Sequence, residues 1–88
     1  MTNWYRLPAD LKVVPNTEGV YLLGDVLQNV VYAGRADNLQ ERLSMHPDPQ
    51  NPCLQRKSIK YFAFEETSDS EDREQELIDK YDPECNRA

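Results

Sequence analysis

The chain has little of several features that define large classes of protein. No apolar run approaches the ~18 residues of a membrane-spanning helix, and the N-terminus lacks the apolar core of a signal peptide. We therefore expect a cytoplasmic protein with no membrane partner. The two cysteines, Cys53 and Cys85, lie far apart and form no C-x-x-C motif. We expect free thiols, with one disulfide or a zinc site that includes His46 as alternatives.

Positive charge is also scarce. Ten Lys and Arg residues stand against sixteen Asp and Glu, a formal net charge of −6. Residues 65–88 hold three basic and ten acidic side chains, so this segment is either a solvated helix or a patch that docks on a basic partner. An acidic protein does not attract nucleic acid through its overall field, so DNA binding needs a local positive face. The residues expected to form that face are Arg35, Arg42, Arg56, Lys57 and Lys60.

A chain of 88 residues makes one domain, so we expect a single domain over residues 1–88. Residues 1–18 contain two prolines and are predicted to be an irregular N-terminal arm. The side chains expected to hold this arm to the body are Trp4, Tyr5, Leu7 and Leu11.

Residues 19–23 and 29–33 are predicted to be paired strands, with a bulge at Gly24 and a turn over residues 25–28. A turn centred between residues 26 and 27 places Tyr21 opposite Tyr32. That register puts both rings on one face with Leu23 and Val30. The opposite face then carries Val20, Leu22, Val31 and Ala33. Both faces are apolar, so both should be covered; an earlier turn at Gly24-Asp25 would separate the tyrosines.

The rest of the chain alternates helix and strand signals. The pattern Asp37-x-x-Gln40 resembles a capping box and predicts a first helix that ends before Pro47. Three prolines predict a loop over residues 47–56, and alternation predicts a third strand over 59–64. Ser68-x-x-Glu71 predicts the start of a second helix that runs to Tyr81. The order β-β-α-β-α indicates a small mixed or antiparallel sheet with helices packed on it.

Two charged residues lie on the apolar stripes of these helices. Arg42 lies beside the helical pair Leu39 and Leu43, and Glu74 lies one turn before Leu77. A buried carboxylate needs a partner, and three interpretations stay open. The two residues form an ion pair, or they line a cleft in which Glu74 binds a divalent cation and Arg42 an anion, or both extend to water at a rim.

Nearby tyrosines favour the cleft, although strand tyrosines are also common packing residues. A phenol can position or deprotonate water, and Tyr21 and Tyr32 are expected to lie near one strand end.

The spacing of these residues resembles a known family motif. GVY at residues 19–21, then ten residues, YAG at 32–34, seven residues and Arg42 resemble the GIY-YIG endonuclease motif. The runs RADNLQERL and EQELIDKYDPECN are similar to the N-terminal nuclease domain of the bacterial excision-repair incision subunit. The chain departs from that pattern in three places: YAG replaces YIG, Glu71-Asp72-Arg73 replaces mostly apolar residues, and Cys85 replaces a tyrosine.

The resemblance implies an α/β (α+β) fold with a three-stranded antiparallel sheet flanked by helices. It also implies a metal-dependent endonuclease that hydrolyses DNA phosphodiester bonds with one divalent metal, Mg²⁺ or Mn²⁺. By matching position, Glu74 is the expected metal ligand, and Arg42 steadies the scissile phosphate. Tyr32 is the expected group that activates water, with Tyr21 beside it.

The resemblance implies further roles at four positions. Gly34 matches a glycine that lets backbone approach the site, and Arg35 replaces a lysine common in the family. His46 matches a histidine of small stand-alone members, and Asn86 matches a closing asparagine that braces the site. Two alternatives stay open: a catalytically weak or inactive binding module that acts through a protein partner, and a nuclease subunit whose partner supplies DNA affinity.

Overall fold

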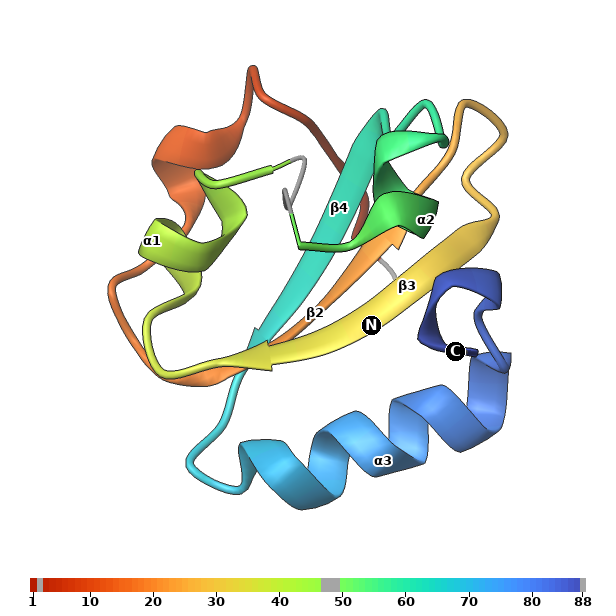
Figure 1. The fold of residues 1–88 in the computed structure, drawn as a ribbon. Helices are drawn as coiled ribbons and strands as arrows, with labels where there is room; N and C mark the ends of the chain where they lie inside the picture. The colour runs from red at the N-terminus through yellow and green to blue at the C-terminus, as the bar shows by residue number, and fades with distance from the viewer. Residues whose placement is uncertain (2, 47–49, 88) are drawn as a thin grey trace.

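The computed structural model describes residues 1, 3–46 and 50–87, whose strands form one antiparallel sheet (Figure 1). The strands lie in the order β1-β4-β2-β3. Their bounds are Tyr5–Arg6 for β1, Gly19–Gly24 for β2, Val30–Ala36 for β3 and Tyr61–Glu66 for β4. All three pairings are antiparallel. In this order β4 and β2 are the inner strands, and β1 and β3 are the edges of the sheet.

The predicted three-stranded sheet is wrong by one strand. The fourth strand, β1, comes from the predicted irregular arm and pairs Tyr5 with Phe62 on β4. The Tyr5 ring stacks at 5.5 Å from Phe62 and 5.6 Å from Phe64, centroid to centroid. This aromatic contact holds a strand of two residues, which is too short for alternation to reveal. The arm also contains a 3₁₀ helix, η1, at Leu11–Val13.

Helices cover both faces of the sheet, as predicted. The helix α3, at Ser70–Tyr81, packs on the face that carries Val20 and Leu22 (Figure 1). The opposite face carries Tyr21 and Leu23, and it is covered by α1 at Leu39–Leu43 and α2 at Pro52–Gln55. The four arm residues that were expected to hold the arm to the body do pack on the sheet. Trp4 packs on the face covered by α3. The opposite face, covered by α1 and α2, receives Tyr5, Leu7 and Leu11.

The predicted register of the hairpin is wrong by two residues. Tyr21 pairs with Gly34, and Leu23 pairs with Tyr32. The backbone turn is centred on Leu27, because the Gln28 N–H donates to the Asp25 carbonyl at 2.9 Å and the Asp25 N–H donates to the Asn29 carbonyl at 3.1 Å. The Asp25 carboxylate supports this turn by accepting hydrogen bonds at 2.9 Å from the N–H groups of Leu27 and Asn29.

The two-residue shift preserves the face on which most side chains lie, since strand side chains alternate with a period of two. Tyr21, Leu23 and Tyr32 share one face as predicted. The register shifts again between Leu23 and Gly24, where we predicted a bulge. Because of this bulge, Val30 and Val31 lie on the faces opposite to those predicted. Val31 lies on the face of Tyr21, and Val30 lies on the other face.

The helix starts and the third strand also differ from prediction. Asn38, not Asp37, caps α1, because the Asn38 side chain accepts a hydrogen bond from the Glu41 N–H. Asp69 precedes α3 in place of Ser68 and makes no capping bond. The strand β4 lies two residues later than the predicted 59–64.

The predicted loop over 47–56 contains α2, where Asn51 caps the helix and Pro52 occupies its first turn. Proline is compatible with that position, because its missing N–H has no partner there. Residues 47–49 of the predicted loop lie outside the described residues. The predicted end of the second helix at Tyr81 is confirmed, and a 3₁₀ helix, η2, follows at Glu84–Asn86.

The expectation of free thiols is wrong, because Cys53 and Cys85 form a disulfide with a Cα–Cα distance of 5.4 Å. It joins α2 to η2, which the fold brings together across 32 residues of sequence. The alternative of a zinc site formed by His46 and the two cysteines is also wrong, because the two sulfur atoms are bonded to each other. Among the described residues, no three His, Cys, Asp or Glu side chains form a metal-binding group.

The described part of the chain contains no helix long and apolar enough to cross a membrane.

Candidate active site

An open pocket of about 600 Å³ lies where the end of β3 meets α1 and α3. Tyr32 enters it from β3, Arg42 from α1 and Glu74 from α3. Three predicted site residues thus come from three elements and meet at one pocket. The remaining lining residues are Arg35, Ala36, Asp37, Asn38, Glu41 and Met45.

The short helix α1 positions Arg42 at this pocket. Leu39 and Leu43 are buried in the core and fix the helix, which leaves Arg42 half-buried beside them. The Arg42 Nε donates a hydrogen bond at 3.3 Å to the hydroxyl of Tyr21, whose side chain is buried. The guanidinium is therefore braced by a core tyrosine at the pocket wall. This arrangement agrees with the cleft interpretation of Arg42 and Glu74.

Glu74 reaches the pocket from the first half of α3. Leu77, one turn further along, is buried against the sheet and anchors the helix. Glu74 is half-buried, and it is the carboxylate of α3 that lines the pocket. Magnesium is often bound through one or two carboxylates, with water and substrate phosphate as its other ligands. Glu74 lines this open pocket together with the carboxylates of Asp37 and Glu41, and one of them alone is enough for that mode of binding.

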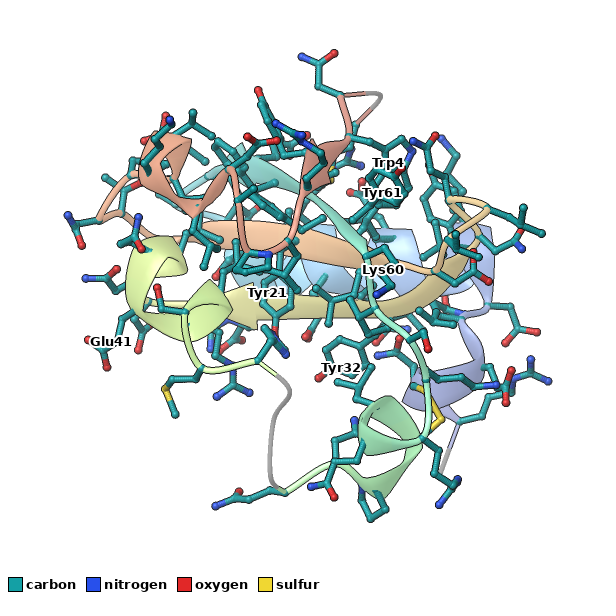
Figure 2. The ribbon with its side chains drawn as sticks, turned by 90° about the horizontal axis from the view of Figure 1, so that it is seen from above. Trp4, Tyr21, Tyr32, Glu41, Lys60 and Tyr61 are labelled. Carbon is teal, nitrogen blue, oxygen red and sulfur yellow. A yellow bond between two sulfur atoms is a disulfide. The ribbon has the colours of Figure 1, made fainter. Side chains whose placement is uncertain are left out.

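The side chains of the two motif tyrosines lie next to each other (Figure 2). The ring centroids of Tyr21 and Tyr32 are 6.1 Å apart. His46 contacts Tyr21 edge-on, with 5.8 Å between ring centroids. The structure therefore brings His46 to the tyrosine pair, on the same core face as Arg42.

Gly34 leaves the space that the two rings occupy. A Cβ atom at this position would lie 2.6 Å from Cζ and the hydroxyl oxygen of Tyr21, and 2.8 Å from Cε2 of Tyr32. Both distances are well below an ordinary carbon contact. The sequence motif suggested that glycine lets backbone approach the site, and the geometry shows that it gives room to the phenols.

Asn86 lies outside the pocket and binds the backbone of β3. Its Nδ2 donates to the Ala33 carbonyl and its Oδ1 accepts from the Ala33 N–H, each at 2.8 Å. Ala33 lies between Tyr32 and Gly34, so this pair of bonds fixes the strand at the point where it enters the site. The bracing role that the resemblance implies for Asn86 thus has a structural counterpart.

Arg35 lines the pocket but is engaged with neighbouring side chains. Its Nε donates to Ser70 Oγ at 2.9 Å, and its Nη2 contacts Asp37 at 3.0 Å. The Ser70 hydroxyl in turn donates to Glu18 Oε2 at 2.6 Å. Sequence reasoning missed Ser70 and Glu18. The available signal was the spacing of four residues between Ser70 and Glu74, which places both on one side of a helix.

The other three residues of the predicted positive face do not line the pocket with Arg35 and Arg42. Lys57 lines a separate apolar pocket and pairs with Glu84 at 2.8 Å. Lys60 lines another pocket with Val26 and Tyr61, at the other end of the sheet from α1 (Figure 2). Arg56 is exposed at the end of α2. The predicted positive face is therefore distributed over different surfaces.

The outer side of α3 is acidic, and its charges influence one another. Asp72 raises the pKa of Asp69 at the start of the helix, because the two negative charges repel. Hydrogen bonds from Arg73 to Glu65 and Glu76, the closest at 2.9 Å, raise the pKa of the Arg73 guanidinium. Arg73, in the first half of α3, is thus already paired with carboxylates.

The fold and the pocket together define a small α+β domain with a tyrosine, arginine and glutamate site. The GIY-YIG catalytic domain is the family whose pattern matches residues 17–87. The chain belongs to the GIY-YIG family, and this nuclease class agrees with the resemblance that the motif spacing indicated.

Curated relatives include two proteins named UvrABC system protein C. The Mycoplasma genitalium protein is 29% identical over 87 residues, covering 92% of this chain and 15% of the relative. The Chlamydia pneumoniae protein is 47% identical over 36 residues, covering 41% of this chain and 6% of the relative. The chain therefore spans about 15% or less of the length of these relatives.

Solved structures with the same fold include the GIY-YIG N-terminal endonuclease domain of UvrC from Thermotoga maritima, bound to magnesium as its catalytic divalent cation. It has a TM-score of 0.65 and 23% identity, over 86% of this chain and 90% of that chain. A point mutant of that domain, bound to its catalytic divalent cation, has a TM-score of 0.68 over 89% and 91% of the two chains, also at 23% identity. This similarity establishes the GIY-YIG fold.

Proposed function

We propose that this chain is a metal-dependent endonuclease that hydrolyses phosphodiester bonds in DNA. The observation that carries the proposal is the meeting of Tyr32, Arg42 and Glu74, from three elements, at one open pocket. The magnesium-bound nuclease domain with the same fold supports it. The proposal includes one domain over residues 1–88 and a cytoplasmic location without a membrane partner.

In this proposal Glu74 holds one Mg²⁺ or Mn²⁺ ion. When bound, the ion polarises the phosphoryl oxygen and stabilises the leaving alkoxide, a contribution of several kcal/mol. Arg42 binds the phosphate oxygens, since a planar guanidinium matches them with parallel N–H groups. The hydrogen bond from Arg42 Nε to Tyr21 keeps the guanidinium oriented while its other nitrogens engage the phosphate.

Tyr32, in its ionised form, positions the attacking water and accepts its proton at the phenolate oxygen, which leaves the tyrosine as a neutral phenol. A phenol acts as a base when positive charge nearby stabilises its ionised form, and Arg42 lies on the same pocket. The Tyr21 hydroxyl orients Arg42 through its hydrogen bond, and Gly34 leaves the space that the two tyrosine rings need. Asn86 fixes the strand that carries Tyr32. Arg35, which lines the pocket, and His46, which contacts Tyr21 and lines the separate apolar pocket, have substrate-binding roles in this proposal.

The test is nicking of supercoiled plasmid DNA in Mg²⁺ or Mn²⁺. Glu74→Ala and Arg42→Ala are each expected to reduce the nicking rate by about 10²–10³-fold, the usual cost of removing one electrostatic stabiliser. Glu71→Ala is the control for Glu74, because it removes an exposed carboxylate from the same helix. Metal-dependent nicking that survives both site substitutions contradicts the proposal.

A second candidate function is a GIY-YIG-fold binding module that acts through a protein partner. The distribution of Lys57, Lys60 and Arg56 away from the pocket favours it, since the predicted face for DNA is not formed. Between the endonuclease and the binding module lies a third possibility, in which this chain is an active nuclease subunit and a protein partner supplies its affinity for DNA. Binding to a specific basic protein with no cleavage of any nucleic acid supports the module. Because this module is catalytically weak or inactive, efficient metal-dependent cleavage of DNA by the isolated chain contradicts it.

A further inference from the structure

Ser70 is a buried polar residue that the proposed mechanism does not use. It is the first residue of α3, and its exposed fraction is 1%. Burial of a hydroxyl is costly unless the group is hydrogen-bonded. Here the hydroxyl is used in both directions, because it donates to Glu18 at 2.6 Å and accepts from Arg35 at 2.9 Å.

These contacts connect three parts of the fold. Glu18 lies directly before β2, Arg35 lies near the end of β3, and Ser70 begins α3. Both bonds involve a charged partner, and such bonds are stronger than neutral ones. We call the three residues the Ser70 relay. It attaches the first turn of α3 to the strand ends beside the pocket.

The relay also explains why arginine is suitable where the family commonly has lysine. The Arg35 guanidinium uses Nε for Ser70 and Nη2 for Asp37, and Nη2 also lies 4.0 Å from Glu18. A lysine has one ammonium on a flexible stem and does not have this rigid fork of donors.

The start of α3 depends on this attachment, because Asp69 provides no side-chain cap. In an α-helix the N–H of residue 74 bonds to the carbonyl of residue 70, so Ser70 and Glu74 are joined by one turn. They also lie on the same side of the helix. A shift of the first turn therefore moves the Glu74 carboxylate relative to Tyr32 and Arg42.

We propose that Ser70 is a positioning residue, which through its relay with Glu18 and Arg35 holds Glu74 in the geometry that binds the divalent cation. This inference rests on the proposed metal-dependent function. It predicts a specific loss of metal affinity when the hydroxyl is removed. A side chain that only stabilises the fold would lower thermal stability and leave metal affinity unchanged.

The experiment measures Mn²⁺ binding by electron paramagnetic resonance, without DNA, alongside thermal unfolding. Ser70→Ala is expected to raise the Mn²⁺ Kd about 5-fold, less than the ~10–100-fold that follows loss of a direct partner of a metal ligand. Ser70→Thr retains the hydroxyl and should restore most of the Mn²⁺ affinity that Ser70→Ala loses. Ser68→Ala is the matched control, since Ser68 is exposed two residues away. Arg35→Lys keeps the positive charge but loses the planar fork that bonds Ser70 and Asp37 together, so it should weaken Mn²⁺ binding in the same direction.

The outcomes separate this inference from the proposed function. An unchanged Mn²⁺ Kd in folded Ser70→Ala, with binding intact in the original chain, overturns the positioning role alone. If Ser70→Ala does not fold, an unchanged Kd in Arg35→Lys has the same meaning. Absence of Mn²⁺ binding and of nicking in the original chain overturns both. A raised Kd that Ser70→Thr restores supports the role of the hydroxyl, whatever the rate of nicking.

Discussion

Gly34→Ala is the substitution whose effect the geometry defines most directly. The added Cβ would lie 2.6 Å from the Tyr21 hydroxyl oxygen, and ordinary van der Waals contact begins near 3.4 Å. The Tyr21 ring must therefore move by about 0.8 Å, and the Tyr32 ring by slightly less. Tyr21 is 1% exposed, so its ring has no open space to enter. Overpacking of this kind costs about 1–3 kcal/mol of unfolding free energy.

The consequence for activity is larger than the consequence for stability. Displacement of catalytic groups by ~1 Å lowers a rate by about 10²-fold, and both phenols and the Arg42 that Tyr21 braces are affected. Plasmid nicking and thermal unfolding of Gly34→Ala measure the two effects. Gly24→Ala is the control, because its Cβ would meet the Trp4 ring at 2.9 Å, at the other end of the hairpin. Nicking by folded Gly34→Ala at the original rate would refute the reasoning.

Two predictions concern stability. Reduction of the Cys53–Cys85 disulfide, or the double change to serine, should lower the free energy of unfolding by about 3–4 kcal/mol, because the bond closes a loop spanning 32 residues. Denaturant melts with and without reductant measure this, and equal midpoints contradict it. Lys57 lowers the pKa of Glu84 through a hydrogen bond, so this pair stabilises the fold above pH ~4.5 and the contribution is lost as pH falls below that value. Lys57→Met should flatten the acid side of the stability profile, and an unchanged profile argues against the pair.

The sequence predicted the residues of the pocket better than the pairing that brings them together. Motif spacing identified Tyr32, Arg42 and Glu74, which line one pocket. The Tyr21–Tyr32 pairing was wrong because the turn is centred on Leu27, with Gln28 at a positive φ of 63°, and because the bulge after Leu23 shifts the strands by one more residue. The rings still share a face, since a shift of two residues preserves alternation.

Other differences have physical causes that a single sequence does not contain. A strand of two residues such as β1 has no period, and its aromatic partners on β4 lie far along the chain. The partner of Cys53 depends on how α2 and η2 pack, which spacing does not specify. Ser70 reads as part of an ordinary helix start, because its partners Glu18 and Arg35 are distant in sequence.

The Asn86 amide has a consequence for how copies of the chain meet. The strand β3 is an edge of the sheet, and an edge of seven residues offers backbone groups to which a strand of another chain can add. Asn86 occupies both backbone groups of Ala33, near the middle of that edge. The Asn86 side chain thus makes the two hydrogen bonds that a neighbouring strand would make at Ala33, which disfavours the addition of a strand from another chain to β3.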